Sequence, residues 1–233
     1  MNGLFITGSD TDVGKTYVSC LIAQGLLQRS FNVIPRKPVE SGCPRELDEL
    51  LPQDARKLSQ AAHYTGSLHE VCPHRFVPAI SPALAASLNN QAVYLKDLID
   101  CCQVDFSQEN NFLITEGAGG FLSPICNDGL NADLASALKL PLILVIENRV
   151  GCINQALLTF EAISQRKLSI AAIILNQIKT ADNSNNPEQN KLSQQVLNDN
   201  IQQITQHTQC PVFTLDKNQS HLPEELFTSL LPH

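Results

Sequence analysis

Short apolar runs alternate with helical periodicities along the 233 residues of the chain. The first run spans residues 4–6 and ends near Gly8, after which apolar residues recur at Val18, Ile22 and Leu26. A short apolar run followed by a repeat of about 3.6 residues is typical of a strand that leads through a tight loop into a helix. We therefore expect a strand that ends at Gly8 and a helix at 16–29.

The same alternation continues through the rest of the chain. Strands are expected at 32–37, 111–115, 140–146, 168–175 and 210–215, and helices at 54–62, 83–88, 94–102, 152–165 and within 187–207, with a short helix after 218. Strands separated by helices predict a parallel sheet with helices on both faces. No linker or repeat divides the sequence, so we expect one three-layer α/β domain over 1–233, with a mostly parallel central sheet.

Composition and charge argue against several classes of function. Apolar residues make up 43% of the chain, and the formal net charge of −7 argues against non-specific binding of nucleic acid. No apolar run approaches the roughly 18 residues of a membrane span, and the first strand follows Met1 without a secretory signal. We expect a soluble, cytoplasmic protein that binds neither nucleic acid nor membrane. The eight scattered cysteines, with no Cys-x-x-Cys pair, are expected to be free thiols.

The loop between the first strand and the first helix has the residues of a phosphate-binding loop, Gly8-Ser-Asp-Thr-Asp-Val-Gly14-Lys15-Thr16. The unpaired N–H groups at a helix start carry roughly half a positive charge and favour an anion. Lys15 would add a full charge, and the hydroxyl of Thr16 can bind Mg²⁺. Five residues separate Gly8 from Gly14, one more than in the usual pattern. The alternative is an ordinary strand-to-helix turn with a solvated lysine.

Two further polar motifs follow strands whose carboxyl ends should lie at the same edge of the sheet. Lys37-Pro38-Val39-Glu40-Ser41-Gly42 follows the second strand, and Glu116-Gly117-Ala118-Gly119-Gly120 follows the strand at 111–115. In a parallel sheet, Lys37 and Ser41 would project into the crevice beside the phosphate loop. Glu116 at a strand tip could help to hold Mg²⁺.

Each of these residues also has an ordinary structural interpretation. Lys37 would be a solvated lysine at a strand end, Asp54 would be an N-cap of the helix at 54–62, and Glu116 would be a turn residue that faces water. For Lys37 alone, the solvated interpretation is at least as well supported. For Glu116, the phosphate loop upstream favours a metal ligand.

Together with Asp54 and Gly151-Cys152-Ile153-Asn154, these motifs resemble dethiobiotin synthetases, an ATP-dependent family of the P-loop NTPase superfamily. The resemblance extends from Gly3 to about Gln177, and the family is similar in carrying the longer glycine spacing. It implies a ligase of biotin biosynthesis that converts 7,8-diaminopelargonate, CO₂ and MgATP into dethiobiotin, ADP and phosphate. A substrate amine would form a carbamate with CO₂, and the carbamate oxygen would attack the γ-phosphate. The second amine would then close the ring from the carbamic-phosphoric anhydride.

The resemblance also implies a role for each matching residue. ATP would be bound by Asp12, Val13, Gly14, Lys15, Thr16, Tyr17, Asp54, Glu116, Gly117, Ala118, Gly119, Gln177 and, at the adenine, Asn176. The substrate would be bound by Thr11, Lys37, Ser41, Gly151, Cys152, Ile153 and Asn154. Mg²⁺ would lie between Thr16, Asp54 and Glu116, and the catalytic cations Lys37 and Lys15 would stabilise charge on the transferred group. In the family the helix start at Gly151 belongs to the partner subunit, so a homodimer with the substrate site at its interface is implied.

Three stretches depart from the family pattern. Ser81-Pro82-Ala83 has alanine where histidine is frequent, residues 183–190 contain no tyrosine, and residues 213–217 replace a Gly-x-Ile-Pro beside the nucleotide base. Two other functions share a phosphate loop, namely a partitioning-type P-loop ATPase switch and a regulator that binds nucleotide without catalysis. The first usually carries a second lysine early in the loop, where this chain has Ser9 and Asp10. Phosphate release that requires both the diamine and bicarbonate would separate the three functions.

Overall fold

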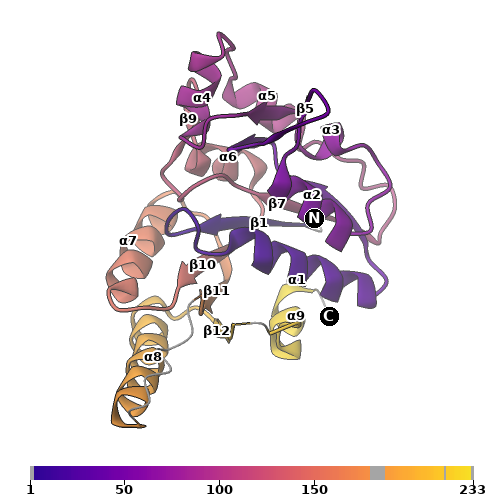
Figure 1. Cartoon of the computed structure of the whole chain (residues 1–233). Coiled ribbons are helices and arrows are strands. Elements are labelled where there is room, and N and C mark those ends of the chain that lie inside the picture. The colour runs from indigo at the N-terminus through magenta and orange to yellow at the C-terminus, as the bar shows by residue number, and fades with distance from the viewer. Residues whose placement is uncertain (1–2, 179–186, 218, 232–233) are drawn as a thin grey trace.

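A parallel sheet of six strands forms the centre of the protein (Figure 1). The computed structural model describes residues 3–178, 187–217 and 219–231. The six strands are β1 Gly3–Gly8, β2 Asn32–Arg36, β7 Asn111–Glu116, β10 Leu142–Glu147, β11 Ile170–Asn176 and β12 Val212–Leu215. Their order is β12-β11-β10-β1-β7-β2, and every neighbouring pair is parallel. The expected α/β architecture is confirmed.

Helices cover both faces of this sheet. One face carries α1 Lys15–Gln28, α2 Gln53–Ala61 and α9 Glu224–Leu230, and the other carries α5 Leu95–Asp100, α6 Asn131–Leu138, α7 Cys152–Gln165 and α8 Pro187–Thr208. Strand β10 supplies both cores, because Ile143 and Val145 pack towards α1 whereas Leu142, Leu144 and Ile146 pack towards α7. A strand buried on both faces has a continuous apolar run, which explains why the sequence pattern identified the sheet.

The helices and central strands expected from the sequence lie within two residues of the observed ones at every boundary. The helix expected at 152–165 has the bounds of α7. The strands expected at 140–146 and 210–215 begin later, after Pro141 and Pro211. Proline has no N–H to donate to a sheet, although the carbonyls of both prolines accept bonds from neighbouring strands.

Several short elements have no counterpart in the sequence analysis. They are β3 Val39–Ser41, β4 Arg45–Glu46, β5 Glu49–Leu50, β6 His74–Phe76, β8 Pro124–Cys126, β9 Gly129–Leu130 and the helices α3 Leu68–Val71 and α6, whereas α4 Pro82–Leu88 was expected. Strands of two or three residues are too short to show a period. Pairing between β3 and β6, which are parallel, depends on contact between segments distant in the sequence.

All eight cysteines are free thiols, as expected. Burial raises the pKa of Cys20 to about 12 and that of Cys43 to about 11, so both thiols stay protonated at neutral pH.

Of the stretch 183–190, residues 183–186 lie outside the described residues and the remainder begins α8. Among the described helices, none has the length and apolar character needed to cross a membrane.

Candidate functional site

A cavity of about 610 Å³ opens at the carboxyl ends of β1, β2 and β7. Its wall combines the phosphate loop, the segment after β2, the start of α2 and the glycine-rich turn after β7. The predicted site residues that line it are Thr11, Asp12, Gly14, Lys15, Thr16, Lys37, Ser41, Asp54, Ala118 and Gly119. Residues 79–82, which lead into α4, complete the lining. Five segments that are distant in sequence therefore meet at the edge where parallel strands end, which is the usual position of a ligand in this kind of sheet.

The phosphate loop passes through two left-handed residues before α1 begins, with φ of 57° at Asp12 and 93° at Gly14. A Cβ at Gly14 would overlap the side chain of Asn176, so this position requires glycine. Gly14 is the N-cap of α1, and in this described part of the chain the helix has neither a side-chain cap nor an acidic residue in its first turn. The first N–H groups of α1 are therefore available to an anion in the cavity.

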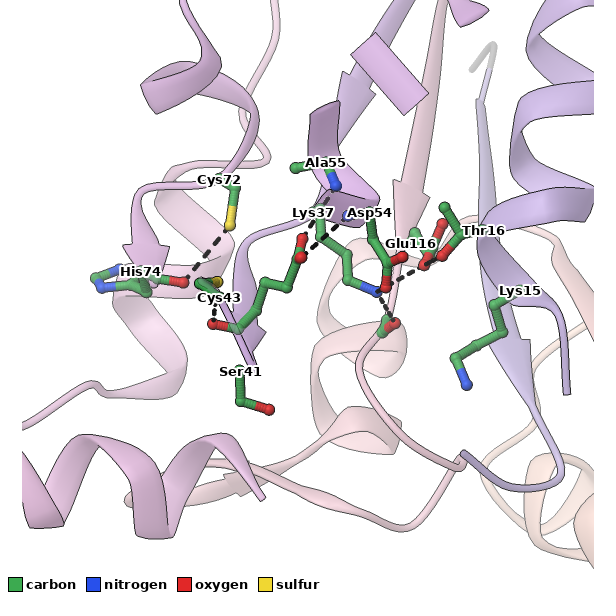
Figure 2. Close-up of polar contacts among 12 residues, drawn as sticks. Lys15, Thr16, Lys37, Ser41, Cys43, Asp54, Ala55, Cys72, His74 and Glu116 are labelled. Atoms are coloured by element: carbon green, nitrogen blue, oxygen red, sulfur yellow. Dashed lines mark hydrogen bonds and ion pairs between the residues drawn. The ribbon is translucent and has the colours of Figure 1, made fainter. Parts of the chain in front are cut away.

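Glu116 is the centre of a polar cluster behind the lining residues Thr16 and Lys37, and it is only 1% exposed. Its Oε1 accepts hydrogen bonds from Thr16 Oγ1 at 2.8 Å and from Lys37 Nζ at 2.6 Å (Figure 2). Its Oε2 is buried and has no hydrogen-bond partner among the described residues. A buried carboxylate oxygen without a partner is costly unless a cation or water joins it. The interpretation of Glu116 as a turn residue facing water is wrong.

Lys37 lies between two carboxylates and is 3% exposed. Besides its bond to Glu116, its Nζ donates to the carbonyl of Gly117 at 3.1 Å and lies 3.6 Å from Asp54 Oδ2. Burial by itself lowers the pKa of Lys37, but Glu116, Asp54 and Glu40 together outweigh burial and raise that pKa above its ordinary value. Lys37 is therefore a buried, charged side chain, and its interpretation as a solvated strand-end lysine is wrong.

For Lys15, the second cation that lines the cavity, the charges of Glu116, Asp54 and Asp12 offset the effect of burial only in part. Its Nζ donates to the carbonyl of Asp10 at 2.9 Å, and the residue is 7% exposed. Burial lowers its pKa to about 8, and the positive charge of Lys37 acts in the same direction. An anion in the cavity would favour the charged form of Lys15. Binding of an anion there would therefore offset part of the cost of burying Lys15.

Glu40 is a site residue that the sequence analysis did not assign, and it lines the cavity from strand β3. Its Oε1 accepts the backbone N–H of Asp54 and its Oε2 that of Ala55, each at 3.0 Å. The N-cap of α2 is Pro52, so the alternative interpretation of Asp54 as an N-cap is wrong. The only signal in the sequence was an acidic residue within the motif at 37–42, and no spacing linked it to α2.

The glycine-rich turn after β7 is held against the phosphate loop by backbone bonds. Gly117 N donates to Ile6 O and Phe121 N donates to Gly8 O, each at 3.0 Å. Two further unassigned residues secure the turn, because Ser123 Oγ accepts from Gly120 N at 2.9 Å and Asn131 Nδ2 donates to Gly120 O at 3.3 Å. Nothing in the local sequence pattern indicated either role.

The residues expected to bind the substrate tail lie apart from this cluster. Gly151, with φ of 90°, is the N-cap of α7, which follows β10. Gly151 and Asn154 are exposed, Ile153 is half-buried and Cys152 is fully buried in the core. None of the four lines the cavity of the described chain. Ser41 does line it, and its hydroxyl donates to the carbonyl of Ile80 at 2.7 Å.

The residues expected near the adenine lie at the tips of β11 and β12. Asn176 is 4% exposed, and its Nδ2 donates to the carbonyl of Val13 at 3.0 Å. Gln177 N donates to Leu215 O at 2.9 Å, which places the two strand ends side by side. The hydroxyl of Tyr17 donates to Gln219 O at 2.5 Å and so links α1 to the segment after β12.

Comparison with known proteins agrees with this geometry. A family model described as an AAA domain matches residues 2–217. The chain is 41% identical over 181 residues to the ATP-dependent dethiobiotin synthetase BioD of Vesicomyosocius okutanii, covering 76% of this chain and 80% of that protein. It is 38% identical over 222 residues to the protein of the same name from Ruthia magnifica, covering 95% and 93%. The chain belongs to the dethiobiotin synthetase family. The resemblance drawn from the sequence motifs is confirmed.

Solved structures support the fold more broadly. The signal recognition particle receptor FtsY from Elizabethkingia anophelis, in complex with GDP, aligns with a TM-score of 0.52 at 14% identity, over 98% of this chain and 63% of that chain. The MinC:MinD cell division protein complex of Aquifex aeolicus aligns with a TM-score of 0.50 at 13% identity, over 99% and 85%. At these identities the likeness concerns the fold alone, whereas the dethiobiotin synthetases share sequence with this chain as well.

Proposed function

We propose that this chain is an ATP-dependent dethiobiotin synthetase that joins CO₂ to 7,8-diaminopelargonate and closes the ring of dethiobiotin. The observation that carries the proposal is the cluster of Thr16, Lys37 and Asp54 around Glu116, beside the uncapped start of α1. Membership of the dethiobiotin synthetase family supports the same reaction. The partitioning ATPase and the non-catalytic regulator are not favoured.

The phosphate groups of ATP would lie over the first turn of α1. The backbone N–H groups after Gly14 and the ammonium of Lys15 supply positive charge there. Lys15 is 7% exposed, so little water screens its charge. Asn176 and Gln177, at the end of β11, would face the adenine. The side chain of Asn176 also donates a hydrogen bond to the carbonyl of Val13 in the phosphate loop.

Three oxygen-bearing side chains meet where a metal ion would join the phosphates. The hydroxyl of Thr16, the carboxylate of Asp54 and the unpartnered Oε2 of Glu116 are hard ligands of the kind that Mg²⁺ prefers. Mg²⁺ usually takes one or two carboxylates and completes its octahedron with water and phosphate oxygens, which this set allows. When bound, the ion would neutralise charge on the β- and γ-phosphates.

Lys37 would then serve the reacting groups. A carbamate oxygen that attacks the γ-phosphate brings one anion towards another, and a fixed cation lowers that repulsion. Its ammonium is held by Glu116 and Gly117, within the lining that it shares with Ser41 and Thr11. Ser41 and Thr11 would position the amine and carbamate end of the substrate.

The carboxylate tail of the substrate would bind at the start of α7 in a second copy of the chain. Gly151 and Asn154 are exposed in one copy and do not reach its own cavity. Two apolar side chains of the same region are also exposed, Val150 at 78% and Leu158 at 60%. We therefore propose a homodimer in which each α7 start completes the partner's site. Free thiols and the need for ATP support a cytoplasmic location.

The test is an assay of phosphate release from ATP, with and without the diamine and bicarbonate, combined with detection of dethiobiotin by mass spectrometry. We expect release only when both substrates are present, with one dethiobiotin formed for each phosphate. Release that does not need the diamine would contradict the proposal and favour an ATPase switch. Nucleotide binding without release under any condition would favour a regulator.

A further inference from the structure

Strand β3 and helix α2 are joined by the side chain of Glu40, fourteen residues before Asp54. Glu40 is 6% exposed, and both of its carboxylate oxygens are used by the first turn of α2. In Figure 2, the two dashed lines that end at the backbone nitrogen atoms of Asp54 and Ala55 mark these bonds. A carboxylate at a helix start satisfies N–H groups that lack partners inside the helix and also favours the helix dipole.

Within the described chain, Glu40 is the side chain that accepts N–H groups from the first turn of α2. The backbone of this turn also closes through Arg56 N to Pro52 O at 2.9 Å. The N-cap of the helix is Pro52, whose side chain offers no acceptor, and no side-chain cap is present. Ala55 is fully buried, so its N–H would be left without a partner if Glu40 were absent. Glu40 therefore contributes to the position of the first turn of α2, together with the burial of Ala55.

The first turn of α2 carries Asp54, which lies 3.6 Å from Lys37 and lines the same cavity. Asp54 makes no other ion pair among the described residues, and its side chain is 39% exposed. Because the Asp54 side chain is this exposed, few neighbouring side chains restrain it. The position of its backbone therefore sets the region that its carboxylate can reach. Groups that orient a metal ligand without touching the metal commonly change metal affinity by about tenfold or more when they are removed.

We infer that Glu40 is a positioning residue for the metal site, whose carboxylate fixes the first turn of α2 and so holds Asp54 towards Thr16, Lys37 and Glu116. The inference rests on the proposed function for the identity of the metal as Mg²⁺ bound with ATP. It assigns Glu40 no contact with substrate. Its effect is therefore expected in metal-dependent binding before it is seen in the chemical step.

The experiment measures ATP affinity by calorimetry in Mg²⁺ and in EDTA, for the wild type, Glu40→Ala and Glu40→Gln. We expect Glu40→Ala to reduce the Mg²⁺-dependent gain in ATP affinity by about tenfold, with little change in EDTA. Glu40→Gln keeps one carbonyl oxygen for one N–H, so its loss should be smaller. In turnover, the Mg²⁺ concentration for half-maximal rate should rise.

A matched control removes a helix cap away from the cavity. The carboxylate of Asp97 accepts the N–H of Tyr94 at 2.8 Å at the start of α5, and Asp97 does not line the cavity. Asp97→Ala should lower thermal stability but leave the Mg²⁺-dependent gain unchanged. The inference would be overturned if Asp97→Ala lost as much of the Mg²⁺-dependent increase in ATP affinity as Glu40→Ala does. It would also be overturned if a folded Glu40→Ala showed the same increase as the wild type. If Glu40→Ala does not fold, an unchanged gain in the nearly isosteric Glu40→Gln would overturn it.

Failure of this inference is distinguishable from failure of the proposed function. A wild type that gains ATP affinity with Mg²⁺ but forms no dethiobiotin would contradict the function, and the role of Glu40 in metal binding would still be measurable. A wild type that forms dethiobiotin, alongside a Glu40→Ala variant with unaltered Mg²⁺ dependence, would contradict only the role of Glu40.

Discussion

Helices α1 and α7 both span 14 residues, follow neighbouring strands, and begin at a left-handed glycine with φ of 93° at Gly14 and 90° at Gly151. Neither has a side-chain cap or an acidic residue in its first turn, in the part of the chain that the structure describes. Both helix starts therefore offer free N–H groups to an anion. One backbone bond distinguishes them, because Cys152 N donates to Arg149 O at 3.1 Å at the start of α7.

Their surroundings differ. The start of α1 is enclosed by Lys15, Lys37 and the carboxylate cluster beside a cavity. The start of α7 carries exposed Gly151 and Asn154 beside the exposed apolar side chain of Val150. A helix start thus becomes a complete site only when other segments enclose it. At α1 this chain supplies them, and at α7 we propose that a second copy does.

The largest effect is expected from Lys37→Met, which removes one of the charged side chains around the start of α1. Turnover should fall about a thousandfold, because the cation beside the transferred group is lost. Without Mg²⁺ and ATP, stability should also fall by about 3 kcal/mol, because Glu116 is left buried without its partner. Thermal denaturation should show MgATP restoring stability more in this variant than in the wild type. A solvated lysine would show no such loss, and an unchanged rate would refute the assigned role.

The next effect separates binding from stability at Lys15. Lys15→Met should weaken ATP binding by about a hundredfold, since a buried charge-assisted contact to phosphate is lost. In EDTA and without nucleotide the same variant should be more stable at pH 7. Burial lowers the pKa of Lys15 from 10.5 to about 8, which corresponds to a penalty of up to about 3 kcal/mol.

The stability advantage of Lys15→Met should depend on pH in a definite direction. The penalty is fully present below pH 8, where Lys15 is charged in both states, and it declines as the pH rises towards 10.5. The advantage of Lys15→Met in chemical denaturation should therefore shrink over this interval. A gain that does not depend on pH would point to packing by methionine rather than to relief of charge burial.

At α7, Leu158→Asp tests whether a second copy covers the helix. Placing a charge in an apolar contact should weaken self-association by about thirtyfold, or about 2 kcal/mol, as measured by sedimentation equilibrium. Leu88→Asp on α4 is a matched control, because Leu88 is 64% exposed and Leu158 is 60% exposed. Equal self-association of the two variants and the wild type would contradict the proposed interface at α7.

The smallest effect is expected at the substrate tail. Asn154→Ala should raise the KM for the diamine about tenfold, because one hydrogen bond to a carboxylate is lost. The KM for ATP should not change, since Asn154 lies outside the cavity of its own chain. Steady-state kinetics with each substrate varied in turn gives both values. An effect confined to ATP would make α7 part of the nucleotide site and remove the contrast with α1.

Much of the fold could be predicted because the relevant information is local. Strands buried on both faces require continuous apolar residues, as at 142–146 in β10, and helices on a sheet require an apolar stripe. The phosphate loop was also recognisable, because its glycines, Lys15 and Thr16 are neighbours in sequence. Short strands such as β3 and β6 were missed because their partners, not their own composition, make them strands.

The sequence by itself determined the alternation of the six central strands with most of the helices, the loop at Gly8 to Thr16 and the family to which the chain belongs. Only the tertiary structure decided the state of the charged residues. Lys37 could have been solvated and Asp54 a cap, but the first is buried against Glu116 and the second is placed by Glu40. Burial and partnership depend on which distant segments meet at the sheet edge, and a one-dimensional pattern does not contain those distances.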